Sequence, residues 1–263
     1  MSDCRKDDDF PWWLVVTAGL FGWFLWQIWN DDLSRQILGT LSRGVQVTIF
    51  VTLVGFSMAS VIGLLLALGS MSKWLVVRQC VRFYVEIVRG IPMLVLLLYV
   101  AFVFAPALVA LRNSVGDVLG LEPARTRDFS LLWRAIIALM IGYSAFISEV
   151  FRAGLLSVDK GQIEAAEALG LSRWHRFRLV VFPQAIRTIL PPLGNDFIAM
   201  IKDSSLVSVL GVLDVTQLGK VTAAGNFRYF ETYNVVALVY LMMTVTLSLG
   251  LRRLEAYMRR RDR

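Results

Sequence analysis

Long stretches without a charged residue constrain this chain more than any other feature of its sequence. Four of them, at 10–30, 44–72, 90–111 and 232–251, reach the ~20 residues that a helix needs to cross a bilayer. In lipid the backbone must satisfy its own hydrogen bonds, as a helix does. Apolar residues make up 57% of the chain, too many for one water-soluble core. The sequence therefore predicts an all-α integral membrane protein.

Two weaker stretches add to these four. Residues 135–148 are uncharged but too few to span alone, so that helix must extend at one end. Residues 179–213 are apolar but interrupted by prolines and charges, and Pro191 and Pro192 each remove a helical hydrogen bond. We interpret this segment as one span with a broken or re-entrant continuation. The prediction is a polytopic bundle of six spans, the fifth irregular.

The distribution of positive charge predicts the orientation of these spans. Six spans place both termini on one side, and Lys and Arg are enriched on the cytoplasmic side of membrane proteins. One set of alternate connections carries 17 of them and the other set 9. The richer set is 1–10, 71–83, 152–187 and the tail after 251, and the poorer set is 30–44, 112–134 and 202–232. We therefore expect both termini in the cytoplasm, and the basic charge requires no nucleic-acid partner.

The connection around residues 159–183 has the signals of a helical hairpin. Asp159 or Gly161 can start a short first helix, and residues 162–169 are good helix formers. Gly170 suits a left-handed C-terminal cap, and Ser172 can cap a second helix that ends near Phe182. An amphipathic hairpin that rests on lipid headgroups would explain these residues as well.

The hairpin also contains the motif of a known family. The matching residues are Glu164-Ala165-Ala166, Gly170, Val180 and Phe182-Pro183. At this spacing they resemble the EAA loop of the membrane subunits of bacterial ABC importers. The run from Phe182 to Leu206 and the segment Arg89-Gly90-Ile91-Pro92 are similar to the polar amino-acid permease branch of that family.

The resemblance implies a MetI-like fold with five core transmembrane helices, to which this chain adds one N-terminal span. Residues 1–43 would comprise a cytoplasmic tail, the extra span and a periplasmic connection. Residues 44–255 would form the importer domain, and residues 256–263 a basic cytoplasmic tail.

The resemblance also implies a function, that of the pore-forming permease subunit of an ATP-driven importer for polar amino acids in a bacterial inner membrane. The hairpin would sit in a groove of a cytoplasmic ATPase subunit. The expected coupling residues are Glu164, Ala165, Ala166, Gly170, Arg173, Arg176, Phe182 and Pro183. The expected partners are a second permease chain, two ATPase subunits that bind ATP and Mg, a periplasmic amino-acid-binding protein and membrane lipid.

Ionisable residues inside spans are candidates for a substrate path, because burying them in lipid is costly. The candidates after the proline pair are Asn195, Asp196, Lys202, Asp203 and Ser204, and Arg89 is a candidate for an inner gate. Together they offer both signs of charge to a zwitterionic amino acid. The alternative is that Lys202 and Asp203 mark the solvated outer end of the span.

Two further patterns predict packing rather than chemistry. Gly55, Ala59, Gly63 and Ala67 lie four apart on one helical face, which favours close packing of a second helix inside the bundle over contact with another subunit. Glu86 with Arg89, and Glu149 with Arg152, have the three-residue spacing of ion pairs on one helix.

Signals of catalysis are missing. His175 is the single histidine, which almost removes metal sites built on several histidines and Ser-His or Cys-His catalysis from consideration. Gly-Lys-Val-Thr at 219–222 is like the end of a phosphate-binding loop, but Asp214 stands where the first glycine belongs. We expect neither enzymatic activity nor a bound cofactor in this chain. A gradient-driven transporter or channel, or a membrane scaffold or sensor subunit, remains as an alternative.

Overall fold

The computed structural model describes residues 12–260, which contain helices and no strand. The helices are α1 (Trp12–Asn30), α2 (Asp32–Ser70), α3 (Leu75–Gly90), α4 (Met93–Tyr99), α5 (Ala105–Leu119), α6 (Leu131–Leu156), α7 (Lys160–Ala168), α8 (Arg173–Arg176), α9 (Phe182–Asp203), α10 (Val215–Asn226) and α11 (Tyr229–Arg260). Shorter helical turns are η1 (Val100–Phe104), η2 (Thr126–Asp128), η3 (Phe177–Val181) and η4 (Ser204–Leu210). The predicted all-α class is confirmed.

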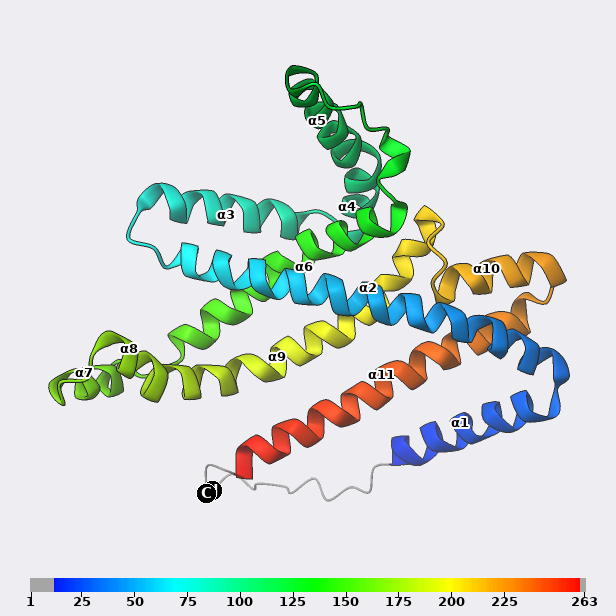
Figure 1. Ribbon diagram of the computed structural model, residues 1–263. Helices are drawn as coiled ribbons and strands as arrows, with labels where there is room; N and C mark the ends of the chain where they lie inside the picture. The colour runs from blue at the N-terminus through cyan, green and yellow to red at the C-terminus, as the bar shows by residue number, and fades with distance from the viewer. Residues whose placement is uncertain (1–11, 261–263) are drawn as a thin grey trace.

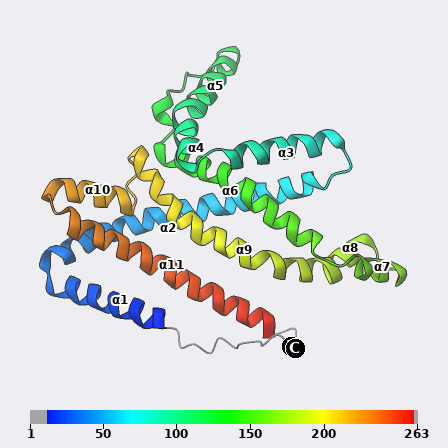
Figure 2. The same cartoon turned by 180° about the vertical axis from the view of Figure 1, so that it is seen from behind.

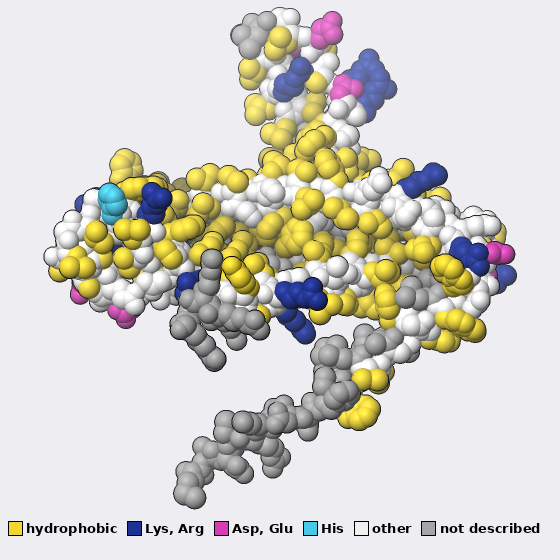
Figure 3. Space-filling view, turned by 60° about the horizontal axis from the view of Figure 1, so that its bottom comes forward, with side chains coloured by type: hydrophobic (Ala, Val, Ile, Leu, Met, Phe, Trp, Pro, Cys, Tyr) yellow, Lys and Arg dark blue, Asp and Glu magenta, His cyan; other side chains and the backbone are white. Residues whose placement is uncertain are grey.

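Four helical segments of the described chain are long and apolar enough to cross a membrane, namely Asp32–Ser70, Met93–Asp117, Leu131–Leu156 and Tyr229–Met258. They contain most of the spans predicted at 44–72, 90–111, 135–148 and 232–251. Figure 3 shows a band of hydrophobic side chains across the middle of one face of the molecule, with charged side chains around its edges and on the projecting part. The helix α1 covers the first predicted span from Trp12 onward, and residues 10 and 11 lie outside the described residues.

The helix α6 is the centre of the bundle. Of its most apolar window 61% is buried, against 22–28% for the other three segments, and α2, α3, α4 and α9 all pack on it. The four small residues predicted to form a packing face of α2 are all buried. At Gly63, an added Cβ would lie 2.9 Å from Cγ2 of Ile147 on α6. The stripe therefore packs inside the bundle, as predicted.

A second close approach predicts the effect of adding one methyl group. An added Cβ at Gly44 of α2 would lie 2.6 Å from the backbone nitrogen of Val215, where α10 begins. Backbone cannot swing aside as a side chain can, so Gly44→Ala should lower the free energy of unfolding by about 1–3 kcal/mol. Gly39→Ala on the same helix is the matched control, because no atom lies within 4 Å of its Cβ position. Thermal denaturation in detergent measures both, and equal melting temperatures would contradict the prediction.

Two connections predicted from charge are instead helical. The helix α2 begins at Asp32, where the carboxylate of Asp31 caps it by accepting hydrogen bonds from the backbone of Leu33 and Ser34. The Ser34 hydroxyl also donates to this carboxylate and lowers the pKa of Asp31. The predicted domain boundary at 43/44 therefore falls inside α2, and the one at 255/256 inside α11. The connection predicted at 71–83 is mostly the charged, amphipathic helix α3.

The proline pair does not interrupt the helix of the fifth span, and the broken continuation that the sequence predicts comes after this helix. The helix α9 runs unbroken from Phe182 to Asp203 with Pro191 and Pro192 inside it. The helices α2, α6 and α11 pack around α9, and such packing lets a membrane helix tolerate the lost hydrogen bonds. The helical path is interrupted later, where η4 ends at Leu210 and the left-handed Gly211 follows before α10 begins.

The segment α4–η1–α5 leaves the bundle, and α5 projects from it in both views (Figures 1 and 2). The buried side chain of Arg134 on α6 fixes its base. This guanidinium donates to the carbonyl oxygens of Ala101 in η1 at 3.0 Å and of Phe129 at 2.9 Å, and also to that of Thr126. Buried charges need such partners, so Arg134 ties the projecting segment to the core.

Candidate functional site

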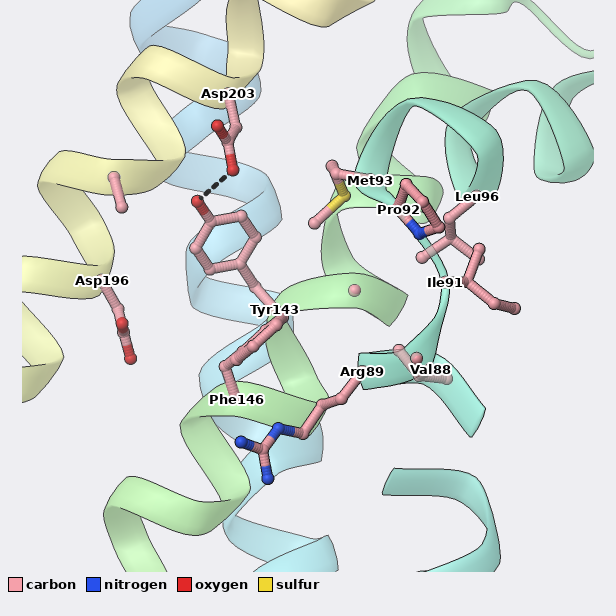
Figure 4. A pocket seen from close by; sticks show the side chains of 13 residues that line it. Val88, Arg89, Ile91, Pro92, Met93, Leu96, Tyr143, Phe146, Asp196 and Asp203 are labelled. Atoms are coloured by element: carbon pink, nitrogen blue, oxygen red, sulfur yellow. Dashed lines mark hydrogen bonds between the residues drawn. The ribbon is translucent and has the colours of Figure 1, made fainter. Parts of the chain in front are cut away.

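A cavity of about 510 Å³ lies where the chain breaks between α3 and α4. The break is at Ile91, whose backbone is extended because a residue before proline avoids the helical conformation. Helices α6 and α9 form the opposite walls (Figure 4). The segment from Arg89 to Pro92, identified in the sequence as a permease element, therefore lines the cavity along its whole length.

Three ionisable side chains from two sides line this cavity. Arg89 comes from the end of α3, and Asp196 and Asp203 come from α9. The Tyr143 hydroxyl of α6 donates to Oδ2 of Asp203 at 2.8 Å, the contact drawn in Figure 4. Oδ2 of Asp196 is buried and accepts no hydrogen bond within the structure. A buried carboxylate oxygen without a donor is costly, so this cavity is suited to a ligand that carries an ammonium group.

Aromatic rings connect the guanidinium to the carboxylates. The guanidinium carbon of Arg89 lies 5.5 Å from the centre of the Phe146 ring, within the range of a cation–π contact. The centre of the Tyr143 ring is 6.3 Å from that of Phe146. One positive and two negative groups thus line a mostly apolar cavity, the combination that would hold both charged ends of a free amino acid.

The predicted path residues divide into two groups. Arg89, Asp196 and Asp203 line the cavity. Asn195 and Lys202 are exposed and do not line it. Ser204 is fully buried and donates to the carbonyl oxygen of Ile201 at 2.7 Å, so its hydroxyl serves the helix end and not the cavity.

Sequence reasoning missed Tyr143 and Phe146. The predicted path residues are charged or follow the proline pair, and neither Tyr143 nor Phe146 has these features. The available signal was Gly142-Tyr143 in the middle of an uncharged span, since a buried tyrosine hydroxyl needs a polar partner from another helix.

The hairpin has the caps that the sequence predicts. The carboxylate of Asp159 accepts from the backbone nitrogen of Gly161 at the start of α7, and the Ser172 hydroxyl accepts from that of His175 at the start of α8. Between them Gly170 has φ +76°, and the next amide, of Leu171, donates back to Ala166 at 3.1 Å. These are the features of a glycine-terminated helix end.

The second helix of the hairpin does not end at Phe182. α8, the π-helical turn η3 and α9 follow one another without a break, so Pro183 lies in the first turn of α9 and starts no separate span. An ion pair across the turn, between Arg176 and Glu167 at 2.6 Å, fixes α8 against α7. The side chains of Gln162 and Gln184 are also hydrogen-bonded to each other.

The predicted coupling residues lie on both sides of this hairpin. Ala166 is buried, and Arg176 and Pro183 are half-buried, so these three support its shape. The exposed ones are Glu164, Ala165, Gly170, Arg173 and Phe182. An exposed apolar surface accompanies them, because Trp174 stacks on Phe177 at 6.2 Å and Phe177 contacts Phe182 at 6.0 Å.

The two predicted ion pairs have different outcomes. Arg152 and Glu149 are paired at 2.6 Å, as expected. Glu86 and Arg89 form no ion pair in the described part of the chain, and that prediction was wrong. Arg89 turns to Phe146 instead, because the end of α3 brings its side chain to the cavity.

Comparison with known proteins places these features in a family. The model of the binding-protein-dependent transport system inner membrane component matches residues 59–263. The glutamine transport system permease protein GlnP of Escherichia coli K12 is 37% identical over 219 residues, which are 83% of this chain and 93% of that protein. The probable amino-acid permease protein YxeN of Bacillus subtilis is 35% identical over 210 residues, 80% of this chain and 87% of that protein.

Solved structures agree with the sequence matches. A chain of an amino acid ABC transporter crystallised with histidines superposes with a TM-score of 0.71 at 33% identity, over 86% of this chain and 98% of that one. The MetNI methionine ABC transporter, at 21% identity and a TM-score of 0.64, shares the fold over 85% of this chain and 98% of its own. The chain therefore belongs to the binding-protein-dependent transport system inner membrane components, and it is the permease subunit of an amino-acid ABC importer.

Proposed function

We propose that this subunit carries polar amino acids across the bacterial inner membrane through the cavity between α3, α4, α6 and α9. The observation that supports this most is the set of charges in that cavity, with Arg89 opposite Asp196 and Asp203. Arg89 would bind the α-carboxylate, and Asp196, whose Oδ2 has no donor, would bind the ammonium group. Charged hydrogen bonds of this kind are stronger than neutral ones.

The hairpin would couple this cavity to ATP hydrolysis on partner subunits. Glu164, Arg173 and the exposed rings of Trp174 and Phe182 would contact the groove of a cytoplasmic ATPase. The importer would be completed by two ATPase subunits, a second permease chain and a periplasmic amino-acid-binding protein. The ATPase subunits would bind ATP and Mg. The relatives named above, a glutamine permease among them, support this assignment.

Both termini would then lie in the cytoplasm. The excess of Lys and Arg, 17 against 9 in alternate connections, supports this orientation. The hairpin and the end of α11 also lie toward the same end of the bundle (Figures 1 and 2). A hairpin that contacts an ATPase must face the cytoplasm, so the two arguments favour the same side.

Co-purification and uptake test the proposal together. The tagged chain, extracted from its own host in mild detergent, should bring down an ATPase subunit. After reconstitution into vesicles with its partners, it should accumulate L-glutamine or another polar amino acid only when ATP is supplied. Accumulation driven by an ion gradient without ATP would identify a secondary transporter instead. A complex with ATPase activity that moves no amino acid would identify a sensor or scaffold subunit.

A further inference from the structure

A second polar cavity lies beside the first, on the side of the hairpin. It has a volume of about 270 Å³ and lies between α3, the end of α2 at Ser70 and the inner half of α6. Arg89 lines both cavities. The two spaces therefore adjoin at this one side chain, which rests on Phe146.

The second cavity is lined by four arginines and two glutamates, and part of this charge is already paired. Arg152 is bound to Glu149 at 2.6 Å. Arg78 donates to the backbone carbonyl oxygens of Ser72 at 2.9 Å and of Lys73 at 3.1 Å, so its guanidinium closes the turn between α2 and α3.

The remaining charges have no partner within the described residues. Arg82 and Glu86 form neither a hydrogen bond nor an ion pair there, and the guanidinium of Arg89 has only its contact with a ring. The three lie four and three positions apart, so they share one face of α3. At 1.5 Å per residue this stripe extends ~10 Å along the helix, from the first cavity toward the hairpin end of the bundle.

Free charges of both signs in one small cavity distinguish between possible ligands. A phosphate or another simple anion would meet the carboxylate of Glu86 together with the arginines. A zwitterion would present its carboxylate to Arg82 or Arg89 and its ammonium group to Glu86. The first cavity offers the same combination, so one transported molecule could use both in turn.

We propose that this inner cavity is a second binding site for the transported amino acid, occupied after the first cavity and before release into the cytoplasm. Arg89 belongs to both sites and passes the carboxylate from one to the other. This inference rests on the proposed function, and it adds a site that the transport activity alone does not require.

Thiol labelling of the assembled complex in inside-out membrane vesicles tests the inner site. Cys4 and Cys80 are first replaced by serine, and Ser70→Cys and Val81→Cys are compared with Phe83→Cys. Ser70 and Val81 line the cavity, and their replacement leaves all of its charges in place. Phe83 is the matched control, because it neighbours Arg82 on the same helix, is 69% exposed and does not line the cavity. A charged, membrane-impermeant thiosulfonate reagent should modify the two cavity positions, and position 83 gives the rate at an exposed site outside the cavity.

Protection by substrate decides what the cavity holds. L-glutamine or L-arginine, whichever the unsubstituted complex transports, should slow the labelling of Ser70→Cys and Val81→Cys several-fold, whereas glucose should not. Labelling that no amino acid slows, or slowing of the same size at position 83, would overturn the inner site.

Transport kinetics provide a second readout with milder variants. Glu86→Gln and Arg82→Gln should lower the maximal rate of ATP-driven uptake and leave the half-saturating external concentration unchanged, because the inner site is filled after the first. A change in half-saturation alone would contradict the order of the two sites. Uptake by the unsubstituted complex is measured in the same vesicles. Normal uptake without protection overturns the inner site only, whereas absent uptake overturns the proposed function.

Discussion

Gly170→Val should abolish most of the ATP-driven uptake while the protein still inserts and assembles. Gly170 has φ +76°, a conformation that costs a residue with a Cβ about 1–2 kcal/mol. Such a cost lowers the population of the native turn by about 5- to 30-fold relative to its alternatives. The turn orients the exposed residues Glu164 and Arg173 with respect to each other, so uptake should fall by a similar factor. Uptake and ATP hydrolysis are measured on the same reconstituted complex.

Gly170→Asn is the matched control for this experiment. Asparagine tolerates a positive φ far better than valine, and the space around position 170 is open, with no atom within 4 Å of an added Cβ. The asparagine variant should therefore retain most of the uptake. If both variants transport normally, the shape of the hairpin has no role in coupling. If both fail equally, the glycine is needed for contact with a partner and not for its backbone conformation.

Asp203→Asn should raise the half-saturating concentration of the amino acid strongly. The carboxylate lines the first cavity and accepts the Tyr143 hydroxyl. Removing its charge should cost about 1.5–3 kcal/mol, the usual contribution of a charged hydrogen bond, or roughly 10- to 100-fold in affinity. Substrate-stimulated ATP hydrolysis in the reconstituted complex measures the change.

Lys202→Gln is the control for Asp203→Asn. It alters the charge of the neighbouring residue, which is exposed and lies outside the cavity, and should leave half-saturation near the value of the unsubstituted complex. Tyr143→Phe keeps the carboxylate and removes only the hydroxyl, so its effect should be intermediate. A loss at position 202 as large as at position 203 would show that charge near the end of α9, and not the cavity, determines affinity.

The hairpin could be predicted from the sequence because local signals determine it. Asp159, Gly170 and Ser172 each fix one helix end through contacts within a few residues, and such contacts depend little on the remainder of the fold. The ion pair of Arg176 with Glu167 joins two elements, and the spacing of the two residues alone did not indicate it.

The cavity could be predicted only in part, because its lining depends on which residues of α9 share the face toward it. Asp196 and Asp203 are seven residues apart and therefore share one face of a continuous helix. Asn195 and Lys202 each precede them by one residue and point elsewhere. The sequence alone did not show where the helix ends after Pro191 and Pro192, so the five polar residues of the segment could not be assigned to faces. Only packing of α9 between its neighbours determines that the helix continues.

The unbroken helical path from Arg173 to Asp203 has a thermodynamic consequence. A rod of ~45 Å cannot lengthen, so a displacement at the hairpin reaches the carboxylates of α9 as a tilt or a rotation. Linkage between two sites is reciprocal. If nucleotide binding to the ATPase subunits changes the affinity of the cavity for its amino acid, then an occupied cavity must change the affinity for nucleotide by the same factor. A permease with an empty cavity would thereby lower the nucleotide affinity of its ATPase subunits and limit ATP hydrolysis without transport.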